Sequence, residues 1–316
     1  MTVSTRSSIA PRARNPKTAP LLNRARGLAV VATGLWALLS GACEAGVTEP
    51  LEAPIGPPAF LIGGEPDFAH TNVGAVVTFI PFLPDNPLQP FCTGTLIAPD
   101  VVVTTGHCAF LLVEFDLPVW FTFDQQFSET SPLIPATAIP HPDFSPSRNP
   151  LDVGGVDRNL VEVGVLLLAD PVKDVAPAML PRPGLLDELR RQGVLRAGAE
   201  FSVVGYGAVA IEDGFPVWDG QRRSMNSPFG SLLPTAVQLG NANQKHTPSA
   251  CFGDSGGPNF FEIDGDAVLT SVTWWIGGGP LAGPNLFELN CASWHRAYRL
   301  DIPEARSFLR NFVDLP

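Results

Sequence analysis

From residue 61 onward, short apolar runs alternate with clusters of Pro, Gly and Asp. The runs are rich in β-branched and aromatic residues, which favour strands. We expect strands at Val73–Phe82, Leu96–Thr105, Val119–Phe123, Leu160–Leu168, Phe201–Val209 and Ala267–Trp275. Only Gly184–Gln192 and Pro303–Val313 show apolar residues at helical spacing. Many short strands without alternating helices predict an antiparallel all-β sandwich or barrel.

The N-terminal segment has a different pattern. Residues 1–26 contain six basic and no acidic residues, and residues 27–42 form an uncharged, mostly apolar run. That run is short for a membrane span and suits the core of a secretory signal, so residues 1–42 are predicted to be a signal peptide. Cys43 follows Ser-Gly-Ala and resembles the lipidated cysteine of a bacterial lipobox. Ordinary cleavage nearby, with Cys43 incidental, is the alternative.

Residues 43–60 separate this signal from the apolar pattern. The stretch contains four prolines and three glutamates and predicts an extended tether or pro-segment without a core. The folded domain is therefore expected at 61–316. Without residues 1–42, the chain holds 14 basic and 31 acidic residues, a net charge of −17. Such a charge repels phosphate backbones and argues against a nucleic-acid partner. Membrane attachment is expected only through a lipid on Cys43.

The chemistry of the chain is concentrated at 251–258, Cys-Phe-Gly-Asp-Ser-Gly-Gly-Pro. Ser255 stands between small residues and is a candidate nucleophile, which needs a base and an orienting third group. His107, beside Cys108, ends the apolar run of Val101 and is a candidate base. No CxxC or HExxH spacing occurs, so no metal site is predicted.

These segments resemble the trypsin/chymotrypsin family of serine peptidases. The matching sequences are Leu-Ile-Gly-Gly at 61–64, Thr-Thr-Gly-His-Cys at 104–108, Val-Gly-Tyr-Gly at 204–207, the 251–258 octapeptide and Tyr-Arg-Leu-Asp at 298–301. They cover about residues 61–313 in the order of the family. The resemblance implies two antiparallel six-stranded Greek-key β-barrels with a C-terminal helix. It also implies a serine endopeptidase that acts on protein or peptide and needs no cofactor.

The resemblance also implies a role for each residue. Ser255 would attack the substrate carbonyl, His107 would take its proton, and the N–H groups of Gly253 and Ser255 would form the oxyanion hole. Glu162 occupies the position of the family's triad aspartate, at the start of Glu-Val-Gly-Val-Leu-Leu-Leu. Asp157 is the alternative acid, although it would need a different loop path.

Cysteine pairing and activation follow the same resemblance. Export implies an oxidising compartment, and a lipidated Cys43 would leave four cysteines for two disulfides. We expect the bridges Cys92–Cys108 and Cys251–Cys291. Asp254 would pair with the α-amino group of Leu61 after cleavage at Phe60–Leu61. The family usually has a basic residue before this bond, so self-cleavage, another peptidase and no cleavage all stay open.

The primary specificity pocket is expected to contain Ser249, six residues before the nucleophile, and Trp275 or Ile276. A serine at the base does not select Arg or Lys, and the bulky wall favours aromatic or medium apolar side chains. The runner-up hypothesis is a catalytically weakened homologue that binds protein without turnover. It is motivated by Glu162, by Phe60 and by this bulky wall.

Overall fold

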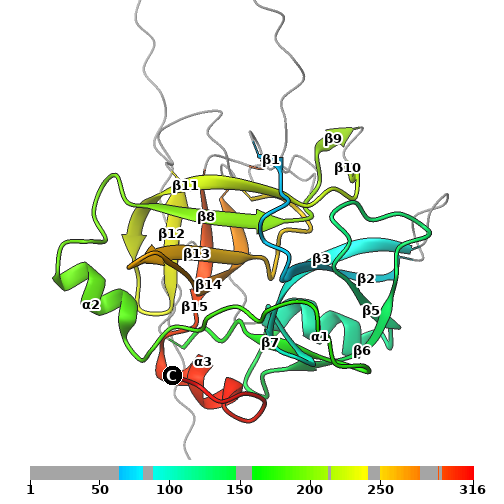
Figure 1. The fold of residues 1–316 in the computed structure, drawn as a ribbon, viewed down its shortest axis with the longest axis horizontal. Helices are drawn as coiled ribbons and strands as arrows, with labels where there is room; N and C mark the ends of the chain where they lie inside the picture. Colours follow the sequence, from blue (N-terminus) through cyan, green and yellow to red (C-terminus); the bar gives the residue numbers. More distant parts are fainter. Residues whose placement is uncertain are drawn as a thin grey trace, which may run out of the picture. The chain divides into compact units, whose positions relative to one another are not determined.

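The computed structural model describes residues 64–80, 88–146, 159–212, 215–240, 250–277, 291 and 294–316, drawn in colour in Figure 1. They all belong to one compact unit, Ala53–Pro316. The predicted signal peptide, the tether, Cys43 and Leu61 lie outside the described residues. Within the described part of the chain, no helix has the length and apolar character needed to cross a membrane.

Six strands form the first barrel (Figure 1). They are β2 (Val73–Phe79), β3 (Leu88–Ala98), β4 (Val101–Thr104), β5 (Val119–Thr122), β6 (Ile134–Pro140) and β7 (Gly164–Leu168). The barrel closes in the order β2-β3-β4-β7-β6-β5, and every pairing is antiparallel. Leu96, Phe121 and Leu166 are fully buried in its interior. The jump from β4 to β7 in the strand order gives the Greek-key connection.

A second closed barrel follows in the chain. Its strands are β8 (Glu200–Gly205), β11 (Arg223–Leu232), β12 (Ala236–Gly240), β13 (Pro258–Ile263), β14 (Asp266–Gly277) and β15 (Trp294–Arg299). They close in the order β8-β11-β12-β15-β14-β13, because β8 pairs with both β11 and β13. Two short additions are β1 (Glu65–Pro66), which pairs with β11, and the hairpin of β9 (Ala210–Glu212) and β10 (Phe215–Val217). The prediction of two six-stranded antiparallel barrels is confirmed.

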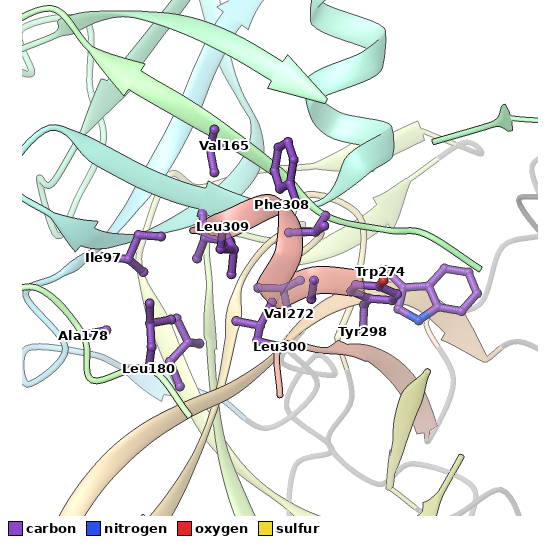
Figure 2. Packing of buried hydrophobic residues seen from close by; sticks show 14 of the residues in the cluster. Ile97, Val165, Ala178, Leu180, Val272, Trp274, Tyr298, Leu300, Phe308 and Leu309 are labelled. Atoms are coloured by element: carbon purple, nitrogen blue, oxygen red, sulfur yellow. The ribbon is translucent and has the colours of Figure 1, made fainter. Parts of the chain in front are cut away.

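The described residues also form three helices: α1 (Gly106–Glu114), α2 (Leu185–Arg191) and α3 (Pro303–Leu309). The two predicted helices are present but shorter, and Pro303 occupies the first turn of α3. Figure 2 shows Phe308 and Leu309 of α3 beside Val165 of the first barrel and Leu300 at the end of β15. This shared cluster draws on both barrels and on α3, so the C-terminal helix helps to hold the barrels together.

Several predicted boundaries were wrong. The run Leu96–Thr105 is not one strand, because the chain turns at Pro99 and Asp100 and folds β4 back on β3. The strand predicted to begin at Leu160 begins at Gly164, as β7. Helix α1 was not predicted, since its apolar sequence is compatible with either a strand or a buried helix.

Candidate active site

His107 is the second residue of α1, which is joined to the end of β4 by the single extended residue Thr105. It therefore begins a helix, whereas the sequence placed it at the end of a strand. Gly106 makes this position possible, because a Cβ there would lie 3.2 Å from Val163 N and 3.3 Å from Glu162 Cα. The absence of a side chain lets the start of α1 approach the segment before β7 closely.

Glu162 reaches the imidazole from that segment. Its Oε2 atom lies 3.1 Å from His107 Nδ1 and accepts a hydrogen bond from the His107 backbone N–H at 3.2 Å. The Glu162 side chain is fully buried, whereas the His107 side chain is 19% exposed. A buried carboxylate is costly unless it is paired, and the imidazole supplies the partner. Asp157, the alternative acid, lies outside the described residues.

The loop of Ser255 is attached to β3 of the first barrel. The Thr93 N–H donates to the Ser255 carbonyl at 2.8 Å, and Thr93 Oγ1 donates to the Gly253 carbonyl at 2.8 Å. The neighbouring Cys92 forms the disulfide with Cys108, the residue after His107. These links place the serine loop beside the imidazole. In the described part of the chain, no hydrogen bond joins Ser255 Oγ to His107, and such bonds often tighten only when substrate binds.

The backbone of 253–257 leaves two amides available. Asp254 N–H donates to Cys251 O, Gly256 N–H to Thr273 O, and Gly257 N–H to Asp254 O. Among the described residues, the N–H groups of Gly253 and Ser255 have no acceptor. This alternation depends on positive φ angles of 93° at Gly253 and 84° at Gly256, which glycine adopts at little cost. Two free N–H groups, one of them the serine's own, can hold a developing oxyanion.

Asp254 points away from the serine into the protein interior and is fully buried. Its Oδ1 accepts from Gly207 N–H and its Oδ2 from Cys251 N–H, both at 2.8 Å. A Cβ on Gly205 or Gly207 would lie within 2.3 Å of these oxygens, which explains why glycines flank Tyr206. Burial raises the pKa of Asp254 to about 7, although the two backbone hydrogen bonds act in the opposite direction.

The predicted specificity residues are only partly described. Trp275 and Ile276 are half-buried residues of β14, and Ser249 lies outside the described residues. The preceding Trp274 belongs to the core shared by the barrels, as Figure 2 shows. The second predicted disulfide, Cys251–Cys291, is present and supports the segment before Ser255.

Two histidines that belong to none of the sequence motifs, His141 and His295, are buried in the structure. His295 lies in β15, is fully buried, and has Nε2 3.1 Å from Asn259 Oδ1. Burial lowers its pKa to about 3, so the ring is neutral. His141 is also buried, with Nε2 3.2 Å from Glu304 Oε1. Both partners are distant in the sequence, so no local signal could have revealed them.

Two groups of potential metal ligands occur among the described residues. The first contains His107 with Cys92 and Cys108, but both sulfurs are tied in the disulfide. The second contains His141, Asp143 and Glu304. There the two ring nitrogens of His141 are already used, by Glu304 and by the Asp143 N–H. Both groups therefore have a structural explanation.

The fold and the sequence comparisons agree. The family described as Trypsin matches residues 82–287, and the chain belongs to this family. The comparison with curated proteins finds no match. The protein thus has a domain with the fold of a serine peptidase, a class of domain that acts on proteins or peptides. Its two disulfides are consistent with an extracellular environment.

Proposed function

We propose that the protein is an exported serine endopeptidase whose triad is Ser255, His107 and Glu162. The observation that carries the proposal is the contact of Glu162 Oε2 with His107 Nδ1, beside the loop that presents Ser255. The buried glutamate would hold the ring in the tautomer with hydrogen on Nδ1, leaving Nε2 free to accept a proton. It would also stabilise the imidazolium that forms.

In this mechanism Ser255 Oγ attacks the scissile carbonyl carbon while its proton moves to His107 Nε2. The carbonyl oxygen becomes an oxyanion that accepts hydrogen bonds from the N–H groups of Gly253 and Ser255. The imidazolium then protonates the leaving amine, which departs and leaves an acyl-enzyme. Water, deprotonated by the same imidazole, hydrolyses the ester and frees the acid. Removing one oxyanion donor typically lowers the rate about a hundredfold or more.

Activation and specificity belong to the same proposal. Cleavage before Leu61 would create an α-amino group for the buried Asp254 carboxylate, which has no cationic partner among the described residues. The specificity would be other than trypsin-like, because Ser249 offers no negative charge to a basic side chain. The signal of residues 1–42 would direct export, and a lipid on Cys43 would anchor the domain through the 43–60 tether.

A fluorophosphonate probe tests the reaction, because it forms a covalent bond only with an activated serine. We expect labelling of the form that begins at Leu61, loss of labelling in Ser255→Ala and His107→Ala, and full labelling in the control Ser307→Ala. Ser307 is exposed on α3 and lies outside the proposed site. Absence of labelling in correctly folded protein would reject the peptidase and favour the binding module.

A further inference from the structure

Arg296 lies in β15 directly opposite Trp275 of β14. Its side chain is only 9% exposed. The guanidinium carbon is 5.3 Å from the ring centre of Trp275 and 5.4 Å from that of Trp294, and the two indole rings are 4.7 Å apart. The cation is therefore held against two aromatic faces, an arrangement that fixes its position.

This arginine differs from the other buried arginines. The other three buried arginines of the described chain all have oxygen partners. Arg222 binds Asp67, and Arg299 binds Asp187 and Asp301. Arg306 binds two backbone oxygens. Arg296 donates no hydrogen bond to any described residue, and its buried Nε has no partner. Burial lowers its pKa, and no carboxylate among the described residues opposes the effect. The Nε group of Arg296 has thus lost water without gaining an acceptor, and an incoming anion would satisfy it.

The position of Arg296 connects it with the serine loop. Gly256, the residue after Ser255, donates its N–H to Thr273 O at 2.7 Å, and Thr273 is two residues before Trp275 in β14. At roughly 3.3 Å per residue, two residues of strand span about 7 Å. Arg296 therefore packs against Trp275 of β14, the strand that contacts the serine loop and would line the substrate site beside Ser255.

We propose that Arg296, framed by Trp275 and Trp294, binds the carboxylate of an acidic substrate side chain on the acyl side of the scissile bond. The inference rests on the proposed peptidase function and names its substrate class. A guanidinium offers a planar fork of donors that matches a carboxylate in two parallel hydrogen bonds, which an amide cannot reproduce. The expectation of an apolar pocket, based on the bulk of Trp275, did not take this cation into account.

One consequence concerns processing. Phe60 carries no negative charge, so an acid-selecting enzyme would cut Phe60–Leu61 poorly. Of the three routes left open by the sequence, the inference therefore favours a different peptidase over self-cleavage.

The test compares substrates in which Glu replaces Gln at each of the four positions before the bond. In fluorogenic tetrapeptides, we expect the wild-type kcat/KM to favour Glu by at least about tenfold at one position. Arg296→Gln should abolish this ratio while retaining fluorophosphonate labelling of Ser255. Arg310→Gln, which removes an exposed charge at the C-terminal end of α3, should leave the ratio unchanged. Arg296→Lys should retain part of it, and this variant decides the test if the Gln variant does not fold.

Binding provides a second measurement that does not need turnover. A fluorescein-labelled Glu tetrapeptide should bind Ser255→Ala at least about tenfold more tightly than the matching Gln tetrapeptide, and Arg296→Gln should remove the difference. Equal preference for Glu and Gln in active protein would overturn the inference and leave the peptidase intact. Suppose instead that wild-type protein is not labelled by the fluorophosphonate probe but still binds the Glu peptide more tightly, and that Arg296→Gln removes this preference. That result would overturn the peptidase and support the acid-binding site.

Discussion

The charge of Asp254 should make the stability of the protein depend on whether the chain has been cut before Leu61. In the described structure, burial raises the pKa of this carboxyl from its ordinary 3.8 to about 7. Between these values, the folded state holds one more proton than the unfolded state, so stability falls as pH rises. The loss accumulates to about 4 kcal/mol by pH 7. An ammonium group beside the carboxylate would lower the raised pKa and remove this loss.

The experiment compares three forms in the Ser255→Ala background, beginning at residues 43, 59 and 61, by urea denaturation between pH 4 and 7. His295 titrates in the opposite sense, because its folded pKa of about 3 makes stability fall as the pH drops below its ordinary 6.5. It is common to all three forms, so it cancels in the difference between them.

We expect the form beginning at Leu61 to be more stable than the other two at pH 7 by up to about 4 kcal/mol, and the gap to close near pH 4. The form beginning at Ala59 is the matched control, since its amine is two residues away from the required position. Parallel pH profiles for the forms beginning at 59 and 61 would refute the pairing of Leu61 with Asp254.

Three further changes test the site and its support. Glu162→Ala should lower kcat/KM about ten-thousandfold. Glu162→Asp should lower it about a hundredfold, because the shorter side chain withdraws the carboxylate from the ring. Equal activity of Glu162→Asp and wild type would contradict the role of Glu162. Gly256→Ala would bring a Cβ to 2.2 Å from Thr93 O in β3 and 2.1 Å from Thr104 Oγ1 in β4, so it should abolish fluorophosphonate labelling. The control Gly265→Ala also has a positive φ, +94°, but its Cβ would meet nothing within 4 Å, so labelling should remain. Asp67→Ala should destabilise the fold by about 3–5 kcal/mol in urea, because it leaves the Arg222 guanidinium buried without its carboxylate, and Asp67→Leu with Arg222→Met should recover much of the loss.

The sequence predicted the architecture well where the signal is local or the motif specific. The strand runs, the first turn at Pro303 and the pairings of both disulfides were all recognisable. Helix α1 was not, because Gly106–Glu114 is mostly apolar and its helical form depends on burial of Ala109 and Leu112 against the barrel. The turn at Pro99 was missed for a related reason, since the apolar residues on both sides read as one continuous strand.

The site shows the same division. The contact of Glu162 with His107 could be anticipated, because the resemblance assigns both positions. The environment of Arg296 could not, since Trp275 lies 21 residues earlier and becomes its neighbour only when β14 pairs with β15. Likewise, Asn259 and His295 meet across the second barrel. Pairings of this kind are set by strand register, which single-residue patterns do not encode.

The cluster shared by the two barrels and α3 has a consequence for catalysis. His107 and Glu162 belong to the first barrel and Ser255 to the second, so their spacing is a property of the contact between two separately closed sheets. The last fourteen residues of the chain fill part of that contact through Phe308 and Leu309. Shortening the C-terminus would therefore leave each barrel its own core, yet change the distance between Ser255 and His107, over which the proposed proton transfer would take place.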